Sequence, residues 1–149
     1  MKRLLAMGDI HGMFDRFLEV WDAVQFRPDE DEIVFLGDYT DRGHQNAAMM
    51  QWVMAHEGEP GMVFLRGNHE AMCADGAGHA ATLLEGDFMF DYHILGHTPV
   101  QLLGKPPVPQ VLADGHVILM DTGSFLSEGR ISCMDLLTHE VWQSRDSEP

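Results

Sequence analysis

Three short motifs, each directly after an apolar run, restrict the fold of this chain more than any other feature. They are Gly-Asp-Ile-His-Gly at residues 8–12, Gly-Asp-Tyr-Thr-Asp-Arg-Gly at residues 37–43 and Gly-Asn-His-Glu at residues 67–70. Neighbouring motifs are separated by about the length of one strand and one helix, as in a βαβ unit. Because parallel strands joined by right-handed crossovers end at one edge of a sheet, we expect the motifs to converge there.

The apolar patterning agrees with that arrangement. In the first half of the chain it predicts strands at residues 3–7, 32–36 and 62–65, and helices at residues 14–24 and 46–56. In the second half it predicts a short helix at residues 80–84, a proline-containing loop at residues 101–110, and strands at residues 92–95, 111–113, 116–120 and 131–136. Alternating elements followed by hairpins place the chain in the α/β class, as a compact sandwich of two β-sheets flanked by helices.

The length of the chain indicates its number of domains, and its charge argues against several classes of function. The 149 residues suit one hydrophobic core, so we expect residues 1–149 to form a single domain. The net charge of −15 argues against nucleic-acid binding and against binding to anionic membrane surfaces. No apolar run approaches the roughly 20 residues that span a bilayer, and the first residues do not resemble a signal peptide. Cys73 and Cys133 have no CxxC spacing and are expected to stay reduced. Without an apparent signal peptide or membrane span, we expect a cytoplasmic location.

The motif side chains are typical metal ligands. Asp9 and His11 lie two positions apart in a glycine-bounded turn, so both can reach one cation. Asp38 follows the next predicted strand, and its two carboxylate oxygens can bridge two cations, while the amide oxygen of Asn68 can bind the second. This mixture of oxygen and nitrogen ligands suits Mn, Fe, Zn, Co or Ni. Two such ions about 3.5–4 Å apart can activate water and stabilise phosphoryl transfer.

The three motifs resemble those of metallophosphoesterases of the phosphoprotein-phosphatase type, including bacterial and phage serine/threonine phosphatases and diadenosine-tetraphosphate hydrolases. The resemblance implies that Asp9, His11 and Asp38 hold a first metal, and that Asp38 and Asn68 hold a second. Gly-His-Thr-Pro at residues 96–99 is similar to the last ligand motif of the family, which implies that His97 also binds the second metal.

The resemblance also implies the catalytic residues. His69 corresponds to the general acid that protonates the leaving group, and Asp41 to the carboxylate that orients it. Arg42 and Arg66 correspond to the cations that hold the phosphate, since each guanidinium can pair two phosphate oxygens. Glu70 is interpreted as supporting the site rather than as a catalyst.

One string leaves two interpretations open. Asp-Thr-Gly-Ser at residues 121–124 follows an apolar run, as in the active loop of aspartic proteases, where two copies meet. The metallophosphoesterase family has a similar Asp-Thr-Gly at this place, so the string does not discriminate. We interpret Asp121 as a supporting or structural residue.

The middle of the chain departs from the family pattern. Relatives usually have several tens of residues more between the Asn-His-Glu and Gly-His-Thr-Pro motifs, including helices over the site and a Val-His-Ala-Gly-like segment with a further metal ligand. Here only residues 71–95 intervene, and the nearest substitute is Gly-His-Ala-Ala at residues 78–81. His79 is either a relocated ligand or a solvent-facing loop histidine. We therefore expect a sandwich that lacks most of the helical covering segment, with an open site, and a homodimer could bury the apolar surface that this segment normally covers.

The expected function is that of a metal-dependent phosphatase that hydrolyses phosphomonoesters by metal-activated hydroxide, with broad specificity. The expected cofactors are two divalent ions, with Mn preferred and Fe, Zn, Ni, Co or Mg as alternatives. The substrate would be a phosphorylated small molecule or a phosphoprotein, with phosphoserine or phosphothreonine in proteins as the first candidate. A dinucleoside polyphosphate hydrolase or a phosphodiesterase is the enzymatic alternative. A metal-binding regulatory module is the alternative outside enzymes.

Overall fold

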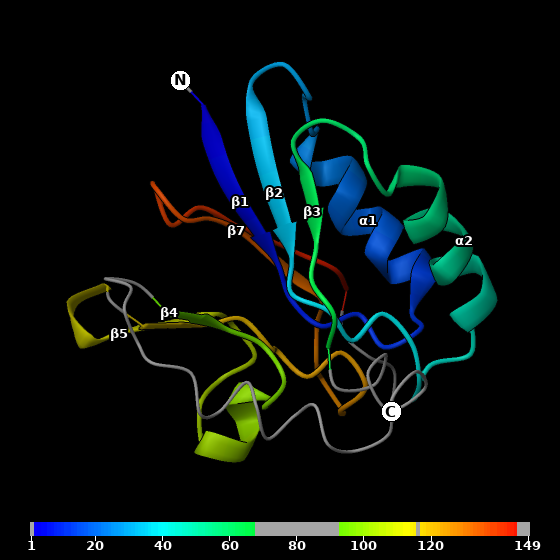
Figure 1. Cartoon of the computed structure of the whole chain (residues 1–149). Coiled ribbons are helices and arrows are strands. Elements are labelled where there is room, and N and C mark those ends of the chain that lie inside the picture. Colours follow the sequence, from blue (N-terminus) through cyan, green and yellow to red (C-terminus); the bar gives the residue numbers. More distant parts are fainter. Residues whose placement is uncertain (1, 68–92, 116, 146–149) are drawn as a thin grey trace.

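The apolar runs of the first half form three parallel strands joined by two helices (Figure 1). The computed structural model describes residues 2–67, 93–115 and 117–145. The elements in chain order are β1 (Arg3–Met7), α1 (Phe14–Val24), β2 (Asp31–Phe35), α2 (Asn46–His56), β3 (Met62–Phe64), β4 (His93–Leu95), β5 (Gln110–Leu112), β6 (Val117–Leu119), β7 (Ser132–Asp135) and β8 (Val141–Gln143). Single 3-10 turns, η1 (Val100–Leu103) and η2 (Ala113–Gly115), lie on either side of β5.

These strands form two sheets. The larger sheet has the order β3-β2-β1-β7-β8, in which β1, β2 and β3 are parallel while β7 and β8 are antiparallel to their neighbours. The smaller sheet has the order β4-β6-β5, with β4 parallel and β5 antiparallel to β6. As a result β1, the first strand of the chain, lies at the centre of the larger sheet.

The alternation of side chains along β1 separates two apolar layers. Leu5 and Met7 belong to the main core, which also contains α1 and α2 residues such as Phe17 and Met49. Ala6 faces the other way and packs with Ile118 of the smaller sheet. The molecule is therefore a layered structure, with helices on one face of the larger sheet and the smaller sheet on its other face.

The main core is rich in aromatic rings. Phe17 and Trp52 meet edge to face with 4.8 Å between ring centroids, and this pair joins the two helices. Phe35 and Phe64 stack at 4.6 Å between ring centroids, and this pair joins β2 to β3. Edge-to-face and offset pairs of this kind add to the free energy gained by burying the rings. They hold α2 and β3 in fixed positions beside the loop that follows β2.

The predicted α/β sandwich of two sheets is confirmed, and both α-helices found in the described part of the chain pack on the larger sheet. The predicted strand at 32–36 begins one residue earlier, and the predicted loop at 101–110 begins with η1. The sequence patterning did not predict β8. The predicted helix at 80–84 and Tyr92 lie outside the described residues. Within the described residues, no helix has the length and apolar character needed to cross a membrane.

Candidate active site

Three predicted metal ligands meet where β1 and β2 end. Asp9 and His11 follow β1 and Asp38 follows β2, and all three residues are at most 3% exposed. One potential ligand atom from each lies within 4.8 Å of the others. His11 Nε2 is 3.6 Å from Asp9 Oδ2. The first two motifs therefore converge at one edge of the larger sheet.

The backbone of the two motif loops holds these side chains together. The amides of Ile10 and His11 both donate to the carbonyl of Asp38, at 3.2 and 2.9 Å. The amide of Gly12 donates to the carbonyl of Tyr39 at 2.7 Å. His11 Nδ1 lies 3.2 Å from the carbonyl of Thr40, and because a carbonyl only accepts, Nδ1 carries the proton. In the neutral imidazole His11 Nε2 then has its lone pair available for a cation, as in histidine ligands oriented by a second hydrogen bond.

The predicted site residues also share an unusual backbone conformation. The described residues include ten non-glycine residues with positive φ, and five of these are predicted site residues. They are His11 (φ 52°), Asp38 (φ 52°), Asp41 (φ 68°), Arg42 (φ 74°) and His97 (φ 78°). Such conformations cost free energy in L-residues and persist only where the surrounding structure imposes them. Their concentration in these loops indicates a functional site.

Glycine is needed where the other loops approach the carboxylates. A Cβ atom on Gly96 would overlap Asp9 Oδ1, and a Cβ atom on Gly67 would overlap Asp38 Oδ1 and the Asp38 backbone nitrogen. The loops after β3 and β4 therefore come within contact distance of the two carboxylates only because their glycines lack side chains.

The buried carboxylates repel one another. The pKa of Asp9 is raised well above its usual value, first by burial and then by the nearby charges of Asp121 and Asp38, while the His97 amide lowers it. Burial also raises the pKa of Asp121, which follows β6 of the smaller sheet. Asp121 Oδ2 is buried and has no hydrogen-bond partner among the described residues. A divalent cation would neutralise this cluster, so the donor set fits the metal that we expected from the sequence.

His97 reaches this cluster through its backbone. Its amide donates to both oxygens of Asp9, at 3.2 and 3.1 Å. The residue is exposed, and its imidazole is not part of the group of ligand atoms found among the described residues. The structure thus brings the backbone of residue 97 to Asp9 of the predicted first metal site, whereas its role as a ligand of the second metal stays a prediction.

The remaining predicted residues are distributed around this group. The Asp41 amide donates to Asn46 Oδ1 at 3.0 Å, which fixes the start of the loop before α2. Arg66 is exposed and is the second residue after β3. The other four predicted site residues lie outside the described residues and are Asn68, His69, Glu70 and His79.

Two residues that the sequence patterning did not single out support the site. Phe125 covers the Arg42 guanidinium, with Cζ 4.4 Å from its ring centroid, and meets the His11 ring edge to face at 5.1 Å. Arg16, on α1, is 8% exposed and donates to the carbonyls of Ser124 at 2.7 Å and Gly129 at 2.6 Å. The Asp-Thr-Gly-Ser string marked this loop, but nothing in the sequence pointed to the side chains that anchor it.

Comparisons with known proteins agree with the geometry. A model of the calcineurin-like phosphoesterase family matches residues 2–147. A symmetrical bis(5'-nucleosyl)-tetraphosphatase of Chromobacterium violaceum is 34% identical over 67 residues, which cover 45% of this chain and 24% of that protein. Serine/threonine-protein phosphatase PP1-delta of Caenorhabditis elegans is 38% identical over 69 residues, which cover 45% of this chain and 22% of that protein. The chain thus matches about a quarter of the length of these curated relatives.

The fold is also similar to that of solved structures. A cold-active protein-tyrosine phosphatase from a psychrophilic Shewanella species superposes with a TM-score of 0.64 at 15% identity. The superposition covers 96% of this chain and 77% of that one. At this identity the likeness concerns the fold alone.

Proposed function

Because the chain belongs to the calcineurin-like phosphoesterase family, we propose that it is a metal-dependent phosphatase that hydrolyses phosphomonoesters. The observation that carries this proposal is the group formed by Asp9, His11 and Asp38. Their ligand atoms lie within 4.8 Å of one another, and all three residues are buried. Burying two carboxylates beside each other costs free energy, which a resident divalent cation offsets.

The proposed ligands are divided between two cations. Asp9, His11 and Asp38 would hold the first, and Asp38 would share the second with Asn68. His97 and His79 are the proposed further ligands of the second ion. When bound, the two cations supply Lewis-acid stabilisation of the phosphoryl group and lower the pKa of the attacking water. Mn is the first candidate, ahead of Fe, Zn, Ni, Co and Mg.

The protein side chains would bind the phosphate and supply the proton. Arg42 and Arg66 each present a planar guanidinium that can pair two phosphate oxygens. The ring of Phe125 lies over the Arg42 guanidinium and limits the orientations it can take. His69 would protonate the leaving oxygen, and Asp41 would hold His69 in the productive orientation.

The first substrate candidate is phosphoserine or phosphothreonine in proteins. The second is a dinucleoside polyphosphate, and it is favoured by the similarity to symmetrical bis(5'-nucleosyl)-tetraphosphatases. The similarity to serine/threonine-protein phosphatases favours the first candidate. A metal-binding regulatory module without catalysis is the proposal outside enzymes.

The remaining expectations stay proposals. We propose one domain over residues 1–149, a cytoplasmic location, and no binding to nucleic acids or membranes. We also propose a homodimer, which a light-scattering mass equal to one chain would disprove.

The decisive experiment measures hydrolysis of 4-nitrophenyl phosphate and the metal content of the same samples. We expect turnover with added Mn, its loss on chelation, and its recovery when Mn is restored. Asp38→Asn should lower both metal content and turnover, because it removes a shared ligand. Asp29→Asn, a matched change at an exposed position, should change neither. Normal metal binding without turnover on any ester would favour the regulatory module.

A second comparison separates the substrate candidates. A phosphoserine peptide and diadenosine tetraphosphate should be tested at equal concentrations with the Mn-loaded protein. A higher kcat/KM for the peptide would support the protein-phosphatase proposal. A higher kcat/KM for the dinucleotide would replace it.

A further inference from the structure

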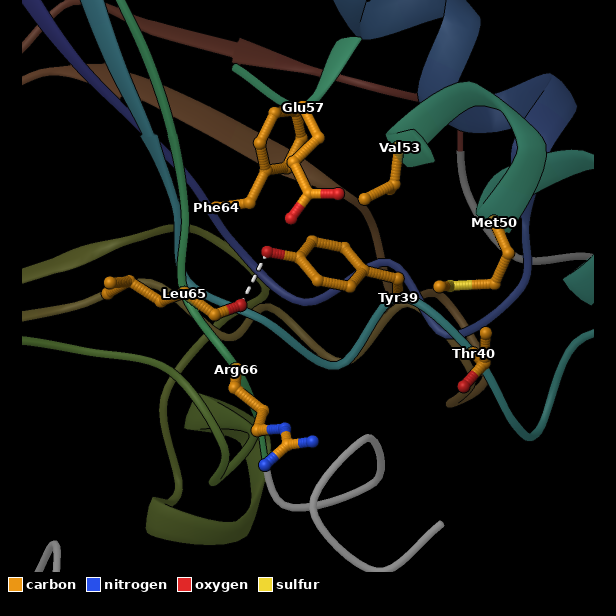
Figure 2. A pocket seen from close by; sticks show the side chains of 8 residues that line it. All are labelled: Tyr39, Thr40, Met50, Val53, Glu57, Phe64, Leu65 and Arg66. Atoms are coloured by element: carbon orange, nitrogen blue, oxygen red, sulfur yellow. Dashed lines mark hydrogen bonds between the residues drawn. The ribbon is translucent and has the colours of Figure 1, made fainter. Parts of the chain in front are cut away.

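A cavity of about 470 Å³ is lined in part by Arg66, one of the two proposed phosphate-binding residues (Figure 2). It is formed by the end of β3, the loop after β2 and one face of α2. That face consists of Met50 and Val53 of α2 and of Glu57, the C-cap residue that directly follows the helix. Their spacing of three and four residues places the side chains on one side of a helix. The volume lies within the range of small-molecule sites.

The middle of the cavity wall is aromatic, and its rings are fixed by contacts with their neighbours. Tyr39 directly follows the proposed ligand Asp38, and its hydroxyl donates to the Leu65 carbonyl at 2.6 Å. The Tyr39 ring meets the Phe64 ring edge to face, with 6.2 Å between their centroids. Phe64 in turn stacks on the buried Phe35. Two aromatic side chains are thus held in place before any ligand binds, which lowers the entropy cost of binding a flat apolar group.

The two ends of the cavity carry opposite charges. Arg66, the proposed phosphate-binding residue, and the carboxylate of Glu57 lie on opposite sides of the Tyr39 ring (Figure 2). Glu57 is also the C-cap of α2, where the partial negative charge of the helix end adds to that of the carboxylate. A ligand that matches this surface has an anion at one end, a flat apolar group in the middle, and a cation or hydrogen-bond donor at the other end.

We propose that this cavity binds the leaving group of the substrate, and that the preferred leaving group is an aromatic ring with a positively charged or hydrogen-bond-donating substituent distant from the phosphate. The inference rests on the proposed phosphatase function, since that function places the phosphate beside Arg66. The aromatic ring would pack against Phe64, which the buried Tyr39 holds in place, and the distant substituent would pair with Glu57. The cavity would thereby determine which phosphate esters bind well.

The test uses phosphonates, which bind but are not hydrolysed, and measures their dissociation constants by calorimetry on the Mn-loaded protein. Benzylphosphonate should bind about tenfold more tightly than ethylphosphonate, because the ring is buried. The 4-aminomethyl derivative of benzylphosphonate should bind about tenfold more tightly than the 4-carboxy derivative, because Glu57 attracts one and repels the other.

Two matched variants identify the residue responsible. Glu57→Gln should reduce the preference for the 4-aminomethyl over the 4-carboxy derivative to about twofold. Glu59→Gln makes the same charge change at a nearby exposed residue that does not line the cavity, and it should leave the preference as in the unmodified protein.

The outcomes for the cavity and for the function can be told apart. Equal or undetectable binding of benzylphosphonate and ethylphosphonate would overturn the cavity proposal. A charge preference that survives Glu57→Gln would overturn the role of Glu57. Failure to hydrolyse both benzyl phosphate and ethyl phosphate would instead contradict the phosphatase proposal, and the phosphonate constants would still decide what the cavity binds.

Discussion

Arg16 should contribute more to stability than an ordinary helix-surface arginine. Its guanidinium donates to the carbonyls of Ser124 and Gly129 at 2.7 and 2.6 Å, and both of these residues are buried. It also donates to the carbonyl of Arg145 at 2.9 Å, which ties α1 to the chain beyond β8. The side chain therefore satisfies backbone groups from two segments far apart in the sequence.

Replacing Arg16 by Met keeps most of the aliphatic volume and removes these donors. Each buried carbonyl left without a partner costs about 1–3 kcal/mol, and the exposed residue Arg145 contributes less. Removing a buried cation gives back part of its desolvation cost. We expect Arg16→Met to lower the free energy of unfolding by about 3 kcal/mol.

The assay is urea unfolding followed by tryptophan fluorescence, with Arg27→Met as the matched control. Arg27 pairs with Glu30 at 2.8 Å, but both side chains are more than half exposed, so its loss should cost at most about 0.5 kcal/mol. Equal destabilisation by the two substitutions would refute the reasoning. So would a loss of less than about 1 kcal/mol for Arg16→Met.

Three further experiments, two on variants and one on the unmodified protein, test the site and the stability of the fold. Gly96→Ala should weaken Mn binding at least about tenfold in a metal titration, because the new methyl group displaces Asp9 from its position, and unchanged affinity would contradict this. The Arg3 guanidinium donates a hydrogen bond to the Asp31 carboxylate, and this bond lowers the pKa of Asp31 in the folded state. The ionised Asp31 therefore stabilises the fold at pH values above its unfolded pKa of 3.8. This stabilisation is lost as the pH falls through the lower pKa of the folded state. In urea unfolding, the difference in unfolding free energy between the unmodified protein and Asp31→Asn should therefore shrink below about pH 4, and a difference that does not vary with pH would exclude this linkage. Burial raises the pKa of Cys133 to about 12, so iodoacetamide at pH 8 should leave this thiol unmodified in the native protein, and peptide mapping would reveal any reaction.

The local pattern of the sequence was enough to predict the first half of the fold. Apolar runs, helix periodicity and glycine punctuation place β1, α1, α2 and the end of β2 close to their observed bounds. The convergence of Asp9, His11 and Asp38 was predictable for the same reason, because these residues lie in the loops after two strands that had to be parallel neighbours.

What the sequence could not provide depends on contacts between distant segments. β8 is only three residues long, and it pairs with β7 through backbone hydrogen bonds, which do not require a particular pattern of side chains. Arg16 lies off the apolar stripe of α1, so a helix taken alone would expose it, whereas the loop after β6 covers it. Phe125 meets Arg42 and His11 only once the two sheets are packed together.

The central place of β1 affects how the chain is made on the ribosome. One edge of β1 pairs with β2, which emerges soon after it, whereas the other edge pairs with β7, where Leu5 is opposite Asp135. During synthesis that second edge stays unpaired until β7 has emerged. An open edge with apolar side chains attracts other strands, and pairings over such a separation form slowly. In the nascent chain this edge of β1 is therefore open to pairing with other strands until the β7–β8 hairpin has formed.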